Sequence, residues 1–470
     1  MPSVTLILIL IFLVARVFAL NFDWERDQLT EETGSNAASR FSSATAAAAS
    51  LNGCRFILSD ADWPSEEEWV SFNQTLDGAL LKPKPLASVC YAGEGYSAAK
   101  CEQLKNNWAD MNLHTDDPTS IMSQWASGNT CTPTSQPNST CIQGVWPVYV
   151  VKAASIRHIQ VAEFLTMLPG TFGILTSVVV KASPPTPLVS GRIRFSTTPP
   201  RGSSAPPAIS TETFWAGMKA YWEHSIAICD AGGLGYSFIY PSSSSTGLTF
   251  TVSISVPNKT LVEYRTFIAP LLEKLNDLGI PQSMPTLQRD LVPRFEHGGG
   301  YGDEKALLGR RALGEITGHT LIASRFFSRS NFNTSSSLAT AHVAIRHLVE
   351  DGELSFHGMN YVPLASLSAN PSNAVNPAFR TTVLHAQAFE PNAHWDGKAV
   401  ALAKEALTAR HARLQGYMQS WRDVTPESGS YINEGDAQDW EWKEAFFGPN
   451  YARLAAIKRR YDGEVYLETD

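Results

Sequence analysis

The sequence predicts an α+β protein of two domains, and three observations lead to this prediction. The chain has 470 residues, more than one hydrophobic core ordinarily holds. Its composition, 43% hydrophobic and 17% charged, is that of a globular protein. After residue 211, helical patterns such as 213–227 mix with alternating strand patterns such as 248–256. This mixture favours an antiparallel sheet covered by helices.

The first twenty residues predict a secretory leader. Residues 4–14 form an apolar run, and Val17 and Ala19 suit the positions that a signal peptidase recognises. We therefore expect a signal peptide over residues 1–19 and a secreted or secretory-pathway protein. The run is too short to span a bilayer, so we expect no membrane attachment once the leader is removed.

Six cysteines suit such a compartment, because an oxidising lumen converts cysteine pairs into disulfides. Cys90 with Cys101 and Cys131 with Cys141 are the expected bridges, while the pairing of Cys54 and Cys229 stays open. N-x-Ser/Thr sequons, which mark glycosylation sites in secreted proteins, begin at Asn73, Asn138, Asn258 and Asn333.

The charge balance argues against a nucleic-acid partner. A formal net charge of -8 and a pI near 5.8 leave no concentrated basic surface for phosphate groups. The one basic cluster, residues 458–460, lies at a predicted helix end, where it complements the helix dipole. We expect a small-molecule substrate instead, and the sequence does not predict an oligomeric state.

The N-terminal part contains the signals of a layered α/β domain. Ser65 before three glutamates predicts a helix start at residue 66. Residues 148–151 form a β-branched strand, and Ser155 can cap a helix that runs to Phe164. A glycine turn at 169–173 then leads into residues 174–180, a strand without charge on either face, which belongs inside a domain.

The middle and the end of the chain are marked by turn residues and caps. Residues 183–210 are rich in Pro, Ser and Gly and indicate a domain boundary with one strand at 191–195. Near the end, Asn450 is placed to cap a helix with Leu454, Ile457 and Tyr461 on one face, and Gly463 would end it.

Residues 169–181, together with residues 431–434 and 446–454 near the end of the chain, resemble two separated motifs of one family, the berberine-bridge-enzyme-like flavoproteins of the vanillyl-alcohol-oxidase type. The stretch 169–181, Pro-Gly-Thr-Phe-Gly-Ile-Leu-Thr-Ser-Val-Val-Val-Lys, resembles the end of that family's FAD domain. Residues 63–65, 90–91, 108 and 373–380 agree in order. The closing stretch resembles the family's C-terminal motif through Tyr431-Ile432-Asn433-Glu434, Trp440, Phe446-Phe447-Gly448-Pro449-Asn450-Tyr451-Ala452-Arg453-Leu454, Ile457-Lys458 and Tyr461-Asp462.

The resemblance implies a two-domain architecture in which a substrate domain interrupts an FAD domain and the C-terminus returns to the flavin. It implies a lead-in and FAD-domain remnant at 20–182, an α+β substrate domain with an antiparallel sheet at 183–415, and a returning segment at 416–470. The implied cofactor is FAD, with no catalytic residue assigned. The implied cofactor-binding residues are Gly170, Thr171, Phe172 and Gly173 at the phosphates and Tyr431, Asn433, Asn450 and Tyr451 at the ring.

This sequence departs from the family in its FAD domain. In the family, a glycine-rich loop with the flavin-attaching histidine follows the strand–helix unit, whereas here Phe164 to Leu168 run directly into Pro169. The departure weighs against retention of FAD. His319 is no substitute, because it lies downstream in the expected substrate domain. Two alternatives to an FAD-linked oxidase therefore stay open: a flavin-free descendant, silent or non-redox, and a truncated gene product.

Other chemistries find little support in the sequence. His342 and His347 lack the spacing of helical metal ligands, so we expect no metal site. A serine-hydrolase elbow is absent from the text. Glu434 and Asp436 form a polar cluster that can do acid–base work, although a solvated loop is the expected environment.

Overall fold

The computed structural model describes two compact units, each of which is considered by itself. Unit 1 comprises residues 1–83, 148–183 and 455–470, and unit 2 comprises 84–147 and 184–454. The described residues are 58–158 with several short breaks, 186–198, 209–241, 247–291, 321–363, 373–390 and 404–461. The predicted leader, the glycine turn 169–173, the strand 174–180 and His319 lie outside these ranges.

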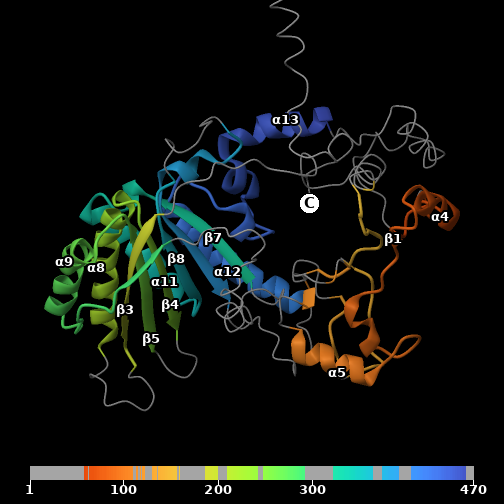
Figure 1. The fold of residues 1–470 in the computed structure, drawn as a ribbon, viewed down its shortest axis with the longest axis horizontal. Coiled ribbons are helices and arrows are strands. Elements are labelled where there is room, and N and C mark those ends of the chain that lie inside the picture. Colours follow the sequence, from red (N-terminus) through yellow and green to blue (C-terminus); the bar gives the residue numbers. More distant parts are fainter. Residues whose placement is uncertain are drawn as a thin grey trace, which may run out of the picture. The chain divides into compact units, whose positions relative to one another are not determined.

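Unit 2 is built on a seven-stranded antiparallel sheet (Figure 1). The strands lie in the spatial order β6-β3-β5-β4-β8-β9-β7. The predicted strand at 191–195 is confirmed and lengthened as β3, and that at 248–256 is confirmed as β5. The bounds are β3 (Pro187–Ser196), β4 (Leu234–Pro241), β5 (Leu248–Pro257), β6 (Gln288–Leu291), β7 (Leu321–Ser328), β8 (Ser355–Asn360) and β9 (Thr382–Glu390).

Helices α8 (Thr211–Asp230), α9 (Leu261–Asp277), α11 (Ser335–Glu350) and α12 (Lys404–Val424) pack against one face of this sheet. The predicted helix 213–227 is confirmed within α8. Polar side chains begin the helices where the sequence offers them: Ser210 caps α8, and Thr260 forms a capping box with Glu263 at α9.

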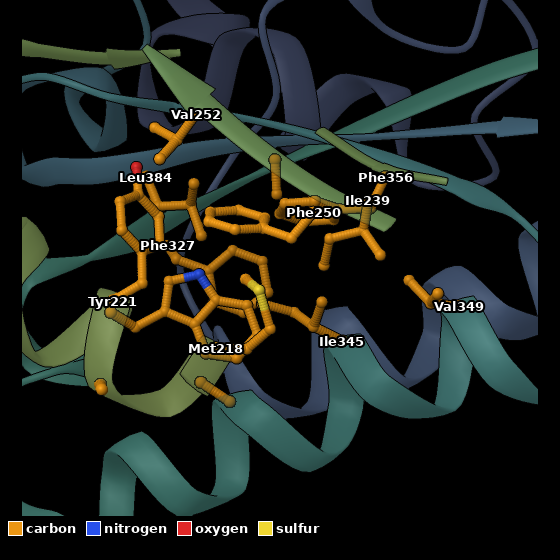
Figure 2. Close-up of a cluster of buried hydrophobic side chains, with 14 of the residues drawn as sticks. Met218, Tyr221, Ile239, Phe250, Val252, Phe327, Ile345, Val349, Phe356 and Leu384 are labelled. Carbon is orange, nitrogen blue, oxygen red and sulfur yellow. The ribbon is translucent and has the colours of Figure 1, made fainter. Parts of the chain in front are cut away.

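One continuous core lies between the sheet and these helices (Figure 2). Alternate side chains of β5 point into it, as the alternating pattern predicts, and Phe250 and Val252 are each 1% exposed. From the helices come Met218, Tyr221 and Ile345, all essentially buried. Burial of these apolar side chains stabilises the unit. The core uses one face of the sheet, and the side chains of the other face are not part of it.

The segment 84–147 has a small core of its own. The 3-10 helix η2 (Leu86–Cys90) and α5 (Ala98–Asn107) are joined by the disulfide Cys90–Cys101, and Cys131–Cys141 closes a second loop, so both predicted bridges are present. Cys229 is a free, buried thiol, and Cys54 lies outside the described residues. The bridges staple a region whose hydrophobic cluster is otherwise small.

The described part of unit 1 contains α4 (Glu66–Thr75) and a two-stranded antiparallel sheet of β1 (Leu80–Leu81) and β2 (Val150–Val151). Ser65 caps α4 in a capping box with Glu68, which confirms the predicted helix start. The strand predicted at 148–151 is present but shorter. Among the residues described, no helix has the length and apolarity needed to cross a bilayer.

Candidate active site

The sheet face opposite the helices carries a row of polar and aromatic side chains. Strand register places Phe238 of β4 beside His357 of β8, and His357 beside Gln387 of β9. Gln387 in turn lies beside Ser324 of β7. Directly opposed residues on neighbouring strands share a face, so these four side chains form one line across four strands.

A hydrogen-bonded chain runs along this line and out to the C-terminal tail. His357 Nδ1 lies 2.7 Å from Gln387 Oε1, and Gln387 Nε2 donates to Glu434 Oε2 at 2.6 Å. Glu434 belongs to the short helix η8 (Ile432–Glu434) of the tail. An amide that donates to a carboxylate turns its oxygen toward the imidazole, so His357 Nδ1 carries the hydrogen.

His385 lies in the next row of the same face. It precedes Gln387 by two residues on β9, and its Nδ1 is 3.7 Å from Glu434 Oε2. The rings of Phe326 and Tyr431 lie 5.2 and 6.0 Å from its own ring. Glu434 is thus connected to both histidines, to His385 directly and to His357 through Gln387.

Both imidazoles are buried and keep a ring nitrogen without a hydrogen-bond partner. His357 is 5% and His385 1% exposed, and Nε2 of each is unsatisfied. Burial lowers the pKa of His357 to about 4, and burial together with the nearby His357 lowers the pKa of His385 to about 4. A buried polar atom without a partner costs about 1–3 kcal/mol, a cost that functional sites often carry.

Aromatic rings surround this cluster. The His357 ring stacks on Phe238 with centroids 4.3 Å apart, and Tyr236 meets it edge-on at 4.4 Å. On the other side, Tyr431 stacks over Phe379 at 6.4 Å. Burial raises the pKa of Tyr361, with further contributions from the Glu434 carboxylate and Tyr431, which keeps this phenol protonated. The surroundings suit a flat organic ligand.

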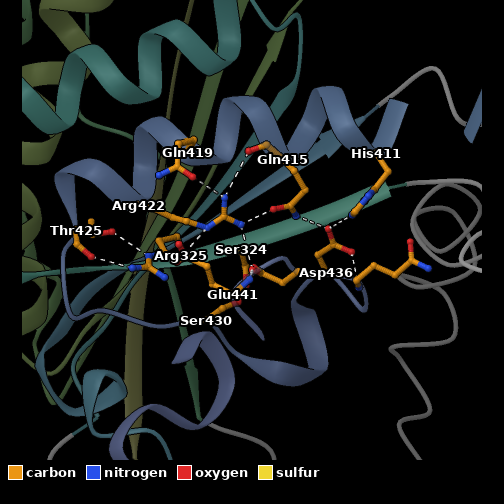
Figure 3. A network of polar contacts seen from close by, with 12 residues as sticks. Ser324, Arg325, His411, Gln415, Gln419, Arg422, Thr425, Ser430, Asp436 and Glu441 are labelled. Atoms are coloured by element: carbon orange, nitrogen blue, oxygen red, sulfur yellow. Dashed lines mark hydrogen bonds and ion pairs between the residues drawn. The ribbon is translucent and has the colours of Figure 1, made fainter. Parts of the chain in front are cut away.

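A buried polar network fixes the tail segment against α12 (Figure 3). Asp436 is 1% exposed and accepts hydrogen bonds from His411 and Gln415, while Arg422 pairs with Asp439 at 3.1 Å. The expectation of a solvated loop at Asp436 is therefore wrong. This burial could not be predicted from the sequence, because the partners His411 and Gln415 lie on α12, more than twenty residues earlier in the chain.

Asn376 holds the next part of the tail. Its amide donates to the Ala445 carbonyl at 2.9 Å, and its oxygen accepts from Ala378 N at 3.0 Å. Gly448 approaches so closely that a Cβ there would lie 2.9 Å from Asn376 Oδ1, and its φ of 53° is left-handed. The two segments that resemble the family, 373–380 and 446–450, are therefore in contact with each other.

The structure describes four of the eight residues assigned to the flavin. Tyr431 and Asn433 meet, because the Asn433 amide donates to the Tyr431 hydroxyl at 2.8 Å. Asn450 directly precedes α13 (Tyr451–Tyr461), and its amide donates to the Val375 carbonyl at 3.0 Å. Tyr451 packs against Trp442 at 5.5 Å. Gly170, Thr171, Phe172 and Gly173 lie outside the described residues.

These contacts limit how the described tail can hold a flavin. The Asn433 and Asn450 amides already have partners within the chain. The Tyr431 hydroxyl accepts from Asn433 and can still donate its own hydrogen, and the residue is 37% exposed. Of the four tail residues, Tyr431 therefore fits the polar edge of a flavin ring best.

Sequence reasoning missed the histidine pair. His357 and His385 stand in short strands far apart in the chain, so neither shows a motif spacing. The available signal was that each imidazole lies between apolar residues of a strand, where a polar side chain is uncommon: His357 follows Phe356, and His385 follows Leu384. Over the part of the chain that the structure describes, no group of three or more potential metal ligands occurs.

Comparison with solved structures identifies the class of this fold. The crystal structure of the VAO-type flavoprotein MtVAO615 from Myceliophthora thermophila matches with a TM-score of 0.71 at 18% identity, covering 87% of this chain and 95% of that one. MtVAO713 from the same organism matches with a TM-score of 0.65 at 17% identity, over the same shares of the two chains. The architecture is thus that of a VAO-type flavoprotein, as predicted.

Sequence comparison then gives the family. Residues 430–465 match the model "Berberine and berberine like". The FAD-linked oxidoreductase sor8 of Hypocrea jecorina is 22% identical over 90% of this chain and 91% of its own length. The FAD-linked oxidoreductase patO of Aspergillus clavatus is 22% identical over 87% and 90%. These comparisons support the assignment of the chain to the berberine-bridge-enzyme-like family of FAD-linked oxidoreductases, with the family model itself matching the closing segment.

The alignment with sor8 shows how much of that relative has no counterpart in this chain. The alignment is 564 positions long, but it includes 90% of the 470 residues of this chain, which is about 423. About 140 positions of the alignment therefore have no residue of this chain. A difference of this size is expected if the glycine-rich part of the FAD domain is missing after Phe164.

Proposed function

We propose that this protein is an FAD-linked oxidoreductase that oxidises a small organic substrate bound over the sheet face opposite α8, α9, α11 and α12. One observation supports this above all. Two buried imidazoles, whose Nε2 atoms have no partner among the described residues, lie close to the Glu434 carboxylate (His385) or are joined to it through Gln387 (His357), in a chain similar to FAD-linked oxidoreductases. Specialised metabolism is the setting we propose, and we propose secretion as the location.

The residues of this chain would divide the work. FAD, when bound, would accept a hydride from the substrate and return the electrons to oxygen. Tyr431 would donate a hydrogen bond to the polar edge of the ring. The aromatic side chains Tyr236, Phe238 and Phe379 would hold a flat substrate and exclude water from the polar cluster.

The first experiment is an absorbance spectrum of the purified protein, followed by acid precipitation. We expect flavin absorbance, and we expect the flavin to appear in the supernatant, because the attachment loop is missing from the sequence. Flavin that stays with the precipitate would contradict the loss of covalent attachment. A colourless protein would contradict the proposal of a flavin enzyme.

A flavin-free descendant is the second candidate, and the tail contacts favour it. The Asn433 and Asn450 amide nitrogens already donate within the chain, and about 140 positions of the alignment with sor8 have no residue of this chain. This candidate predicts a colourless protein that unfolds cooperatively and whose melting temperature does not rise with added FAD. Insoluble protein would favour a truncated gene product, which sequencing the transcript across residues 164–169 would settle.

A further inference from the structure

The two unpaired nitrogens on the sheet face have a defined chemical character. Gln387 donates to the Glu434 carboxylate, so its oxygen faces His357 and requires a hydrogen on His357 Nδ1. The opposite amide orientation would set an oxygen against the carboxylate. Because His357 is neutral at pH 7, its Nε2 carries a lone pair and can only accept a hydrogen bond.

His385 has the same character. Its Nδ1 faces the Glu434 carboxylate at 3.7 Å, which favours the hydrogen on that nitrogen, so its unpaired Nε2 also presents a lone pair. Among the described residues neither of these two buried acceptors has a partner, so each is suited to a ligand or a water that donates a hydrogen bond. Glu434 itself is partly exposed and faces the cluster from the tail.

We propose that His357 Nε2 binds the hydrogen-bond donor of the substrate, a hydroxyl or N–H on a flat conjugated skeleton, and takes its proton during oxidation. Gln387 and Glu434 are positioning residues that hold His357 in this tautomer. The chemical step rests on the proposed function. With FAD bound to accept the hydride of the substrate carbon, the O–H bond would break, its electron pair would form the carbonyl, and the proton would move to His357 Nε2.

The groups that face His357 suit this role. Tyr236 of β4 meets the His357 ring edge-on, His385 of β9 lies near it, and Glu434 of the tail is linked to it through Gln387. Among these, Glu434 alone carries a charge at neutral pH, and it is negative. It therefore stabilises the imidazolium that forms when the proton arrives.

Calorimetric titration with two probes tests the binding half without any turnover. 4-Methylphenol carries one donor, and 4-methylanisole has the same ring without it. We expect the wild-type protein to bind the phenol about tenfold more tightly than the ether. In His357→Phe, which keeps a ring against Phe238, the preference should fall below about threefold with affinity for the ether unchanged. His347→Phe, on the exposed side of α11, is the matched control and should keep the preference.

Glu434→Gln tests the positioning residue. It should lower the preference for the phenol a few-fold in the wild-type background and have no further effect in His357→Phe. If His357→Phe does not fold, Glu434→Gln decides, because its side chain is 43% exposed. Three results would each overturn the proposal. They are an unchanged preference for the phenol in His357→Phe and Glu434→Gln, no preference in the wild type, and displacement of the bound phenol when micromolar Zn²⁺ is added.

The flavin content of the same samples separates this inference from the proposed function. Colourless protein that shows the His357-dependent preference would remove the oxidase function and keep the binding role. Yellow protein without the preference would keep the oxidase function and overturn the role of His357.

Discussion

At the scale of single residues, buried charge holds the tail that carries Glu434. Arg422 lies within 3.1 Å of Asp439, and both side chains are 5% exposed. Its neighbour Arg325 is also buried, and donates to the Thr425 carbonyl at 2.9 Å. Burial and the nearby Arg422 lower the pKa of Arg325, because both disfavour the charged guanidinium. Buried charges of this kind destabilise the fold when their partners are removed.

Removal of the Arg422 guanidinium should therefore destabilise the protein strongly. We expect Arg422→Met to lower the free energy of unfolding by about 3–5 kcal/mol, because Asp439 is left buried and unpaired. Arg329→Met is the control: its ion pair with Asp230 is 41% and 57% exposed and should cost less than about 1 kcal/mol. Urea unfolding at pH 7 measures both, and equal losses would contradict the argument.

At the scale of elements, strand register and helix packing decide what the active-site residues meet. The register that pairs Phe238 with His357 and His357 with Gln387 follows from the alternation that sends Ile239 and Phe356 into the core. A slip of one residue would bury the wrong face, so the core enforces the polar row. On the helical side, α8 and α11 pack through His342, which lies between two tryptophans.

This helix contact should make stability depend on pH. Burial, with smaller contributions from Arg346 and Lys219, lowers the pKa of His342 from 6.5 to about 4, against a weaker opposing effect of Glu350. Between these values the unfolded chain binds more protons, so stability falls as pH falls from about 6.5 to 4. We expect the wild type to lose about 1–3 kcal/mol more than His342→Phe between pH 7 and 4.5.

The measurement is chemical unfolding at both pH values, with His347→Phe as the exposed control on the same helix. If the stability of His342→Phe depends on pH as strongly as that of the wild type, His342 is not the cause of the pH dependence. His357 and His385 also have lowered pKa values, so the variant should keep part of the pH dependence of stability.

At the scale of the whole molecule, the chain has a seven-stranded antiparallel sheet and lacks residues at many positions of its alignment with a relative. The VAO-type fold extends over most of the chain, yet about 140 aligned positions of its relative sor8 have no counterpart here. The disulfides in residues 84–147 suit an oxidising compartment.

Expression in eukaryotic cells with the native leader tests that compartment. We expect secreted protein with N-linked glycans at Asn138, Asn258 and Asn333, which are all exposed. Asn73 is half-buried and its oxygen accepts from Leu80 N at 2.9 Å, so it should be modified less. Peptide-N-glycosidase should lower the apparent mass, and replacing the three exposed asparagines by glutamine should abolish that shift. Protein retained in the cytoplasm without glycans would contradict a secretory origin.

The sequence by itself determined the α+β class, the local disulfides Cys90–Cys101 and Cys131–Cys141, the helix start at Ser65, the helix over 213–227, and the family resemblance of the closing tail. These features depend on residues that are close together in the chain or on a contiguous motif, so they can be predicted from the sequence alone.

Only the tertiary structure decided the polar row. His357, Gln387 and Glu434 come from three segments spread over nearly eighty residues, and strand pairing brings them together. It also showed that Asp436 is buried, because its partners His411 and Gln415 lie on another element. Burial and tautomer depend on what surrounds a side chain, and those surroundings are fixed by long-range contacts that no local pattern encodes.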